Sequence, residues 1–420
     1  MLHQATLPGS APRRGAAACA AIRGGGALSG CCCMPDRQPG GGSSSGSRAS
    51  SSGRGKVVVG AGPGGVNKGL GLLEWTGKVV PQGLLVGGVK EAWRQAWQVM
   101  VRELAPQDRS GAYVRQSYAF ESKPSNMVAE PGRYHLYLGN ACPWCHRVHL
   151  AYVLRGFSPK TLGITQLGSD PTKARRGGWI FTRAAPDPVW GAQDLWEVYE
   201  RASPGYTGRC TAPLLVDAKT KRVVSNESAD IVAALDALQL PGCSDVMLRP
   251  GQAADAKEVD AMCEQIYRDI NNGVYVSGFS TTQAAYDAAQ ARLFSALDNL
   301  EERLSASRFV MGDRFCLADV WLFPTVCRLD AVYANIFKCG RKLVRADYPN
   351  LQAWLRDVWQ LRVPGASLQV PDTINIDDAR ASYNGSLFPV NPSGIVPAGP
   401  TQADLKLDEP AGRGAAAPVG

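Results

Sequence analysis

The chain has 420 residues, 45% of them hydrophobic and 20% charged, which is enough for about two or three domains with sizeable cores. This composition excludes a wholly disordered chain, and no apolar run reaches the ~20 residues of a membrane-spanning helix. Most of the net charge of +8 lies in residues 1–56, which hold seven Lys and Arg against one Asp. The remaining chain has too little positive charge for a nucleic-acid-binding surface.

Residues 1–75 are predicted to be a disordered leader followed by a Gly-rich linker. Asp36 is the only acid before Glu74, and Trp75 is the first aromatic residue, so the segment buries too little apolar surface to offset its ordering entropy. Arginines without acids, among Ala and Ser, are typical of an organelle transit peptide. We therefore expect import into the chloroplast, with the mitochondrion or the cytoplasm as alternative locations. A disordered tail without a targeting role is the simpler alternative.

Residues 76–128 are predicted to form an N-terminal extension with one amphipathic helix. Apolar residues recur there at helical spacing, and the run ends before Pro106: Val89, Trp93, Trp97, Met100 and Leu104. A single apolar stripe of this kind predicts a helix that packs against the main body of the protein.

Residues 129–242 have the pattern of a thioredoxin-like α/β domain. Residues 133–138 alternate as a strand, and a Gly-Asn turn leads into a helix that begins at Pro143. Residues 213–217 and 223–224 are predicted to pair as a hairpin, after which a second helix opens at residues 227–228.

Residues 251–365 are predicted to form an all-helical domain. Two apolar stripes at helical spacing support it: Val259, Cys263, Ile266 and Ile270 in the first, and Tyr286, Ala289, Leu293, Leu297, Leu300 and Leu304 in the second. Further helices are expected near Cys316 and Asn350. Residues 366–420 are predicted to be an irregular tail that is disordered at its end.

The strongest chemical signal is Cys142-Pro143-Trp144-Cys145 at the junction of a strand and a helix. Unpaired N–H groups and the helix dipole stabilise a thiolate at a helix N-terminus, and Cys145 lies one turn further, where a second thiol could resolve a mixed disulfide. Zinc would need a second ligand pair, and no other CxxC exists outside the leader, so we expect no metal. A purely structural pair of buried cysteines is the other alternative. The eight cysteines outside the leader are scattered, which is typical of a reducing compartment.

Two weaker signals follow in the same domain. Thr211-Ala212-Pro213 precedes a strand at the place where thioredoxin-like folds have a cis-proline, although a trans surface proline would look the same in a sequence. Glu227-Ser228 at a helix start offers N–H groups and a hydroxyl to a carboxylate, although a simple helix cap would have the same pattern.

These signals, in this order and before an all-helical domain, resemble a glutathione transferase. The closer resemblance is to the glutathionyl-hydroquinone reductases, or Xi-class glutathione transferases, and within them to the plastid and cyanobacterial branch. It covers roughly residues 85–400 and is carried by distant motifs: residues 133–137, 141–144, 178–181, 206–209, 226–228, 272–275, 328–333, 337–339 and 391–397.

The resemblance implies a function and a set of site residues. Cys142 would attack the sulfur of a glutathionyl-hydroquinone, Tyr275 would protonate the aromatic carbon, and a second glutathione would release oxidised glutathione. Glutathione would be the co-substrate, held by Trp179, Arg209, Ala212, Glu227 and Ser228. Tyr333 and, in the tail, Tyr383 would stabilise the thiolate. The resemblance alone also implies a homodimer held through the helical domain. Each tyrosine could instead be an ordinary core or interface aromatic residue.

Three functions stay open at this point. The family usually has Ala in place of Cys145, so a glutaredoxin-like or omega-like thiol transferase or dehydroascorbate reductase that uses both thiols is the second hypothesis. A non-catalytic binding module on a transferase scaffold is the third. A module needs neither Cys142 nor Tyr275, which argues against it.

Overall fold

We describe residues 81–116, 120, 127–244 and 247–413 of the protein in a computed structural model. The predicted leader and linker, residues 1–75, lie outside the described residues. In the described part of the chain, no helix is both long and apolar enough to cross a membrane.

The first domain is built on a five-stranded sheet with the order β3-β2-β1-β4-β5. Its strands are β1 (Tyr134–Gly139), β2 (Gly163–Ser169), β3 (Trp179–Ile180), β4 (Leu214–Asp217) and β5 (Arg222–Ser225). β1 runs parallel to β2 and antiparallel to β4, and β4 and β5 form the predicted hairpin. Its helices are α3 (Pro143–Leu154), η1 (Pro171–Arg176), α4 (Leu195–Ala202) and α5 (Ser228–Ala237). A parallel βαβ unit followed by a hairpin and a helix is the predicted thioredoxin-like arrangement.

The second domain is helical. Its elements are α6 (Ala253–Ile266), which continues as the π-helix η2 (Tyr267–Asn271), α7 (Gly273–Phe279), α8 (Gln283–Ala306), α9 (Leu317–Arg328) with the π-helix η3 (Leu329–Tyr333), α10 (Ala334–Ile336), α11 (Val344–Asp347) and α12 (Pro349–Trp359). The first predicted stripe is buried throughout. In the second, five of the six residues are buried, and Tyr286 is half-buried.

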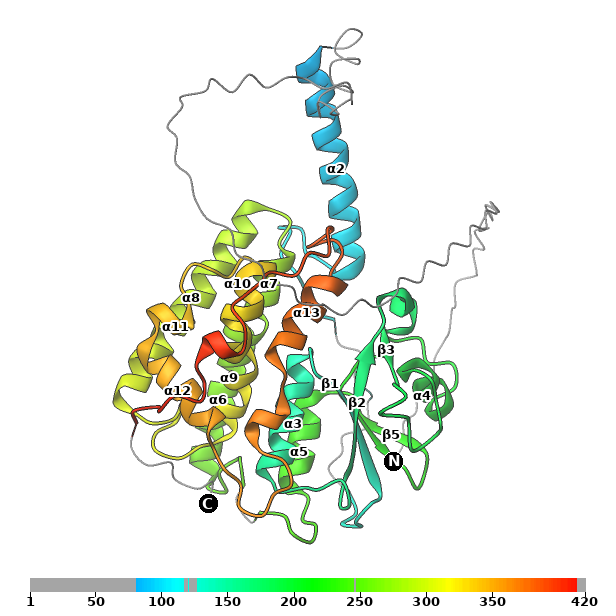
Figure 1. Cartoon of the computed structure of the whole chain (residues 1–420), viewed down its shortest axis with the longest axis vertical. Coiled ribbons are helices and arrows are strands. Elements are labelled where there is room, and N and C mark those ends of the chain that lie inside the picture. The colour runs from blue at the N-terminus through cyan, green and yellow to red at the C-terminus, as the bar shows by residue number, and fades with distance from the viewer. Residues whose placement is uncertain (1–80, 117–119, 121–126, 245–246, 414–420) are drawn as a thin grey trace, which may run out of the picture. The chain divides into compact units, whose positions relative to one another are not determined.

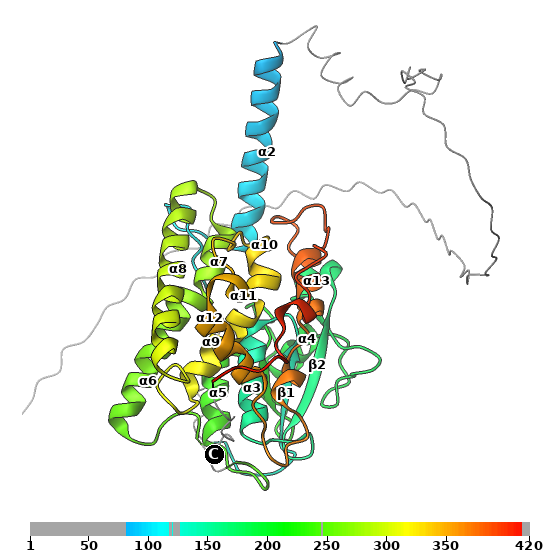
Figure 2. The ribbon, with the colours of Figure 1, turned by 60° about the vertical axis from the view of Figure 1, so that its left-hand side comes forward.

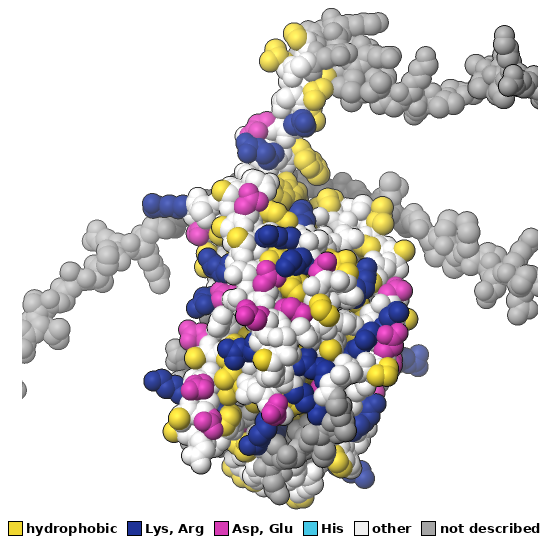
Figure 3. Space-filling model, turned by 90° about the vertical axis from the view of Figure 1, so that its left-hand side faces the viewer, with side chains coloured by type: hydrophobic (Ala, Val, Ile, Leu, Met, Phe, Trp, Pro, Cys, Tyr) yellow, Lys and Arg dark blue, Asp and Glu magenta, His cyan; other side chains and the backbone are white. Residues whose placement is uncertain are grey.

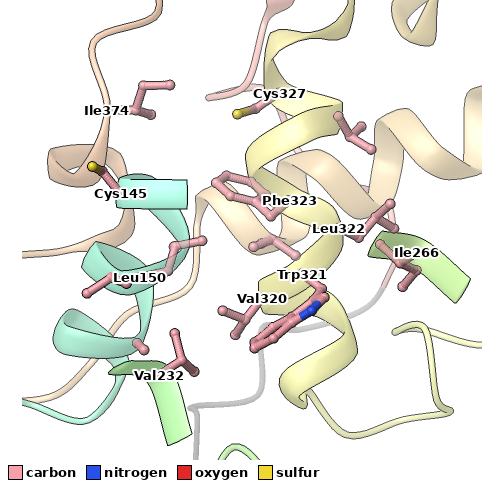
Figure 4. Close-up of a cluster of buried hydrophobic side chains, with 14 of the residues drawn as sticks. Cys145, Leu150, Val232, Ile266, Val320, Trp321, Leu322, Phe323, Cys327 and Ile374 are labelled. Carbon is pink, nitrogen blue, oxygen red and sulfur yellow. The ribbon is translucent and has the colours of Figure 1, made fainter. Parts of the chain in front are cut away.

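Helices α3 and α5 lie between the sheet and the helical domain (Figure 1). All twelve residues of α3 are buried, including the polar His146, Arg147 and His149, so no face of this helix is turned to solvent. A continuous apolar cluster joins α3 to α9, with Leu150 on one side and Val320 and Phe323 on the other (Figure 4). This shared core fixes the start of α3 against the helical domain.

The N-terminal helix α2 (Gln82–Leu104) forms where the sequence predicts it and begins before the apolar stripe. Only its C-terminal end is covered, where Val101 and Ala105 are buried and the indole N–H of Trp97 donates to the Pro389 carbonyl at 2.7 Å. Val89 is 63% and Trp93 58% exposed. The helix therefore packs on the body only at its C-terminal end, because it is longer than the surface it contacts. Figure 2 shows this helix from another side. Figure 3 shows hydrophobic side chains along it, above a face of the body on which Lys and Arg are mixed with Asp and Glu.

The prediction of an irregular tail is wrong in part. After the 3₁₀ helix η4 (Val370–Thr373), residues Ile376–Ser386 form the regular helix α13, capped by Asn375, whose side chain accepts from the Asp378 N–H. A further 3₁₀ turn, η5 (Ala403–Leu405), follows, and Leu405 and Leu407 are buried. The short, polar sequence of α13 hides its periodicity, and the helix is held by tertiary contacts instead.

Candidate active site

Cys142 stands at the N-cap of α3, directly after the turn that follows β1. Its backbone is extended, and its carbonyl accepts the first helical hydrogen bond, from the His146 N–H at 3.0 Å. Pro143 occupies the first helical position, where a missing N–H costs nothing. The half-buried Cys142 thiol points at the loop before β4 and lies 3.5 Å from the carbonyl oxygen of Ala212. The Ala212–Pro213 peptide bond is cis, as the sequence pattern suggested.

The environment of Cys142 lowers the pKa of its thiol to about 7. The largest cause is a hydrogen bond from the Cys145 thiol, and burial opposes it. Backbone N–H groups of Cys145 and Trp144 and the positive charge of Arg115 act in the same direction as the thiol hydrogen bond. A substantial fraction of Cys142 is therefore thiolate at neutral pH, which is what a nucleophile requires.

Cys145 lies one helical turn after Cys142 and differs from it in burial and in the pKa of its thiol. Its side chain is buried, and burial together with the neighbouring Cys142 raises the pKa of its thiol well above the ordinary value. Cys145 is consequently a protonated donor next to a partly ionised acceptor. The two thiols have distinct roles before any substrate arrives.

A cavity of about 300 Å³ opens beside this helix start. Residues from three parts of the chain line it: Trp144, Ala212, Glu227 and Ser228 of the first domain, Tyr267 of the helical domain, and Arg115 of the N-terminal extension. Glu227 caps α5, where its carboxylate accepts from the Ala229 N–H at 3.4 Å. The predicted residues Ala212, Glu227 and Ser228 are thus brought together on one wall.

A buried arginine, Arg147, contacts Ser228 of this wall from the protein interior. One guanidinium nitrogen of Arg147 donates to Ser228 Oγ at 3.4 Å and the other to Asn271 Oδ1 at 2.7 Å. The guanidinium also lies 4.0 Å from the ring centre of Trp321. Burial lowers the pKa of Arg147 to about 10, so it keeps its charge. Arg147 is not predicted as a site residue from the sequence, although its place directly after Cys-Pro-Trp-Cys-His is a usable signal.

Three tyrosines meet on the helical side of the site. The hydroxyl groups of Tyr275 on α7 and Tyr383 on α13 share a short hydrogen bond, and Tyr383 also lies 3.4 Å from the Tyr333 hydroxyl. Burial raises the pKa of all three phenols well above the ordinary value, so they hold their protons at neutral pH. The charge of Cys142 also contributes to the raised pKa of Tyr275. Among the described residues, no hydrogen bond joins Cys142 to Tyr333 or Tyr383.

Two predicted glutathione-binding residues lie outside the lining of this cavity. The ring of half-buried Trp179 covers the backbone at Gly139, where an added Cβ would come within 2.2 Å of the indole. Arg209 is exposed and reaches the Leu104 carbonyl at 3.4 Å. The cavity instead includes Arg115, whose guanidinium lies 4.2 Å from the ring centre of Trp144. No local pattern in the extension marks Arg115, so only the fold reveals it.

The two histidines next to the cysteines are engaged elsewhere. His146 Nε2 lies 2.8 Å from Thr373 Oγ1, and His149 Nδ1 lies 3.2 Å from the Thr373 carbonyl oxygen. In the portions of the chain that the structure describes, no three His, Cys, Asp or Glu side chains gather in a group that could hold a metal ion.

A thioredoxin-like domain with a cysteine at the first helical turn, joined to an all-helical domain that supplies aromatic hydroxyls, defines a glutathione transferase. Family models agree: residues 141–238 match the glutathione S-transferase N-terminal domain, and residues 283–357 match the C-terminal domain. The chain is 40% identical over 327 residues to the glutathionyl-hydroquinone reductase PcpF of Sphingobium chlorophenolicum, a match that covers 76% of this chain and 97% of PcpF. It is 36% identical to the glutathionyl-hydroquinone reductase YqjG of Escherichia coli, over 79% of this chain and 98% of YqjG.

Solved structures give the same result. The Xi glutathione transferase of Phanerochaete chrysosporium superposes with a TM-score of 0.63 at 33% identity, over 70% of this chain and 94% of that one. Glutathione-bound YqjG of Escherichia coli superposes with a TM-score of 0.60 at 35% identity, over 68% and 90%. The chain belongs to the glutathionyl-hydroquinone reductases, the Xi class of the glutathione transferases.

Proposed function

We propose that this protein reduces glutathionyl-hydroquinones to hydroquinones, with glutathione as the co-substrate and Cys142 as the nucleophile. The observation that carries the proposal is a thiol with a pKa of about 7 next to a cavity and next to a protonated phenol. The names of the relatives PcpF and YqjG, and a glutathione-bound structure of YqjG, support the same reaction.

In the first step, the Cys142 thiolate attacks the sulfur of the glutathionyl thioether. A sulfur–sulfur bond forms, the carbon–sulfur bond breaks, and the electron pair leaves on the aromatic carbon. Tyr275 is our candidate for the acid that protonates this carbon, because its phenol interacts electrostatically with Cys142 and holds its proton at neutral pH. Hydroquinone leaves, and Cys142 remains as a mixed disulfide with glutathione.

In the second step, the thiolate of a second glutathione attacks the glutathione sulfur of the mixed disulfide. Oxidised glutathione leaves, and the Cys142 thiolate is regenerated. Ala212, Glu227 and Ser228 would hold the first glutathione, because they line the cavity beside Cys142. Trp179 and Arg209 are not among the residues that line this cavity, and neither are Cys142 and Tyr275, so a bound substrate would have to extend beyond the cavity to reach them.

A thiol transferase of the omega type is the second candidate function. The hydrogen bond between the Cys145 and Cys142 thiols favours it, and a Schizosaccharomyces pombe relative at 32% identity is named glutathione S-transferase omega-like 2. A non-catalytic module would have no use for a thiol whose pKa is lowered.

Intact mass spectrometry with the glutathione conjugate of menadiol tests the proposal. We expect enzyme, conjugate and free glutathione to yield menadiol and oxidised glutathione, and Cys145→Ala enzyme quenched after mixing with the conjugate alone to carry one glutathionyl group on Cys142. Turnover of a small disulfide without turnover of the conjugate would favour the omega-type activity instead.

We also propose that residues 1–55 direct the protein to the chloroplast and are then removed. The acid-poor, arginine-containing composition supports this proposal. A reporter fused to residues 1–75 tests it, and a reporter that stays diffuse in the cytosol would contradict it.

Finally, we propose a homodimer held through the helical domain, on the strength of the family membership. Light scattering across micromolar concentrations is the measurement, and a monomer mass throughout that range would rule the dimer out.

A further inference from the structure

The two thiols of Cys142-Pro143-Trp144-Cys145 are close enough to share a hydrogen bond. Cys142 sits at the N-cap of α3, facing the Ala212 carbonyl, and Cys145 lies one turn further in, beneath it. Figure 4 shows Cys145 on the first turn of α3, within the apolar cluster that joins the two domains. A second thiol in this position is not needed for the reaction proposed above, which takes its second thiol from free glutathione.

We propose that Cys145 is a resolving thiol, so that the protein can complete one reduction without free glutathione and ends as a Cys142–Cys145 disulfide. The inference rests on the proposed function, because it begins from the mixed disulfide between Cys142 and glutathione.

The step balances in atoms and electrons. The Cys145 sulfur attacks the Cys142 sulfur, a new sulfur–sulfur bond forms, and the bond from Cys142 to the glutathione sulfur breaks. Its electron pair leaves with glutathione, which takes up the proton that Cys145 releases. One glutathionyl-hydroquinone and the protein dithiol thus become one hydroquinone, one reduced glutathione and one protein disulfide. Two glutathione molecules then return the disulfide to the dithiol and leave as oxidised glutathione.

The first step prepares Cys145 to react. Two of the causes that raise its pKa are its hydrogen bond to Cys142 and the negative charge of Cys142, and both disappear once Cys142 carries glutathione. The backbone hydrogen bond with Gly139 and the charge of Arg328, which lower the pKa, remain. Burial, the largest cause of the raised pKa, also remains, so the pKa of Cys145 falls from its value in the dithiol without losing the effect of burial. Its fixed position also gives it the advantage of an intramolecular reactant.

Arg328 can favour the thiolate of Cys145 because it is a buried cation whose hydrogen-bond partners are neutral. Its side chain is fully buried and donates to the carbonyl of Asn140 at 2.9 Å, to the carbonyl of Pro324 at 2.8 Å and to His146 Nδ1 at 2.8 Å. Burial and the charge of Arg328 keep the pKa of His146 well below its ordinary value, so this partner is neutral. Among the described residues, no carboxylate pairs with Arg328. An uncompensated buried charge is costly unless it stabilises an anion nearby.

A single-turnover experiment tests the inference. Reduced, desalted protein in excess is mixed with the menadiol–glutathione conjugate in the absence of free glutathione, quenched with acid and weighed intact. We expect menadiol and free glutathione in equal amounts, and a protein lighter by two hydrogen atoms whose disulfide maps to Cys142 and Cys145. In Cys145→Ser and Cys145→Ala, the protein should instead stay heavier by one glutathionyl group. Two variants are used because Cys145 is buried, and Ser is close to Cys in size.

Cys327→Ser is the matched control. Cys327 is also a buried thiol near Arg328, but its Sγ lies 3.9 Å from His146 rather than next to Cys142. This variant should form the Cys142–Cys145 disulfide as the unaltered protein does. Menadiol release with a lasting glutathionyl adduct in the unaltered protein would overturn the inference and leave the proposed function intact. Absence of both menadiol and adduct would overturn the proposed function itself.

Discussion

The two sides of the proposed reaction centre are built in opposite ways. The thiol side is local: Cys142, its capping position, Pro143 and Cys145 all belong to one strand–helix junction. The tyrosine side is assembled from α7, the end of η3 and α13, and its hydroxyl groups are joined by hydrogen bonds across 108 and 50 residues of sequence. A hydrogen bond from the Cys145 thiol, together with local backbone N–H groups, lowers the pKa of the Cys142 thiol, whereas burial raises the pKa of the phenols. The site therefore holds a partly ionised thiol and protonated phenols at the same pH, although the thiol and the phenols lie far apart in the sequence.

The largest effect is expected on the nucleophile side. Cys142→Ser should lower reduction of glutathionyl-hydroquinones roughly a thousandfold or more, because an alcohol is almost fully protonated at neutral pH. Steady-state turnover of the menadiol conjugate with glutathione is the measurement. Cys145→Ala is the control, and it should keep substantial activity, since free glutathione can resolve the mixed disulfide. A Cys145→Ala protein as inactive as Cys142→Ser would show that the dithiol cycle is obligatory.

The next effect separates the two sides directly. Tyr275→Phe should slow the hydroquinone reaction about 10²–10⁴-fold, because the departing carbon loses its proton donor. Disulfide exchange needs no proton on carbon and should change much less. Both rates are measured on the same preparation, with glutathionyl-menadiol and a small glutathione mixed disulfide as substrates. Equal losses in the two reactions would mean that Tyr275 has a structural role only.

A smaller effect on the hydroquinone rate is expected from Tyr383, whose hydroxyl is hydrogen-bonded to that of Tyr275. Tyr383→Phe removes the hydrogen-bond partner of the Tyr275 hydroxyl and should lower the hydroquinone rate about tenfold, since it orients the acid without donating the proton itself. The rate of Cys142 alkylation should stay unchanged. Tyr286→Phe is a matched control, because its hydroxyl donates to the Lys338 carbonyl, away from the site. A loss in Tyr286→Phe equal to that in Tyr383→Phe would point to a general stability effect.

The smallest effect is expected on the pKa of Cys142, from the positive charge of Arg115 in the N-terminal extension. The rate of Cys142 alkylation by iodoacetamide should rise with pH around a midpoint of about 7, because only the thiolate reacts. Arg115→Gln removes a positive charge that favours the thiolate, so the midpoint should move to higher pH, modestly, as Arg115 is the last of the causes that lower the pKa. Arg109→Gln, an exposed arginine of the same segment, should leave the midpoint in place. A shift of equal size in both variants would indicate a general charge effect on the segment.

The helix α2 shows what the spacing of apolar residues cannot predict. As with the three tyrosines, the partner of the helix is set by the tertiary structure. Its apolar spacing predicts a helix and one apolar face, and both are present. The spacing does not say how far the partner surface extends, and that surface ends near Trp97, so Val89 and Trp93 remain exposed. Likewise, α13 has too weak a pattern to be predicted, although it carries Tyr383.

By itself, the sequence determined the thioredoxin-like and helical domains, the place of Cys142 at a helix start, the Ala212–Pro213 turn and the Glu227 cap, because each depends on residues within one or two turns of chain. Only the tertiary structure decided that Arg115 reaches the cavity, that Tyr383 meets Tyr275, and that the charge of Arg328 is buried near Cys145. The physical reason is the range of the forces involved. Capping hydrogen bonds act between near neighbours in sequence, whereas burial and Coulomb interactions depend on distances in space.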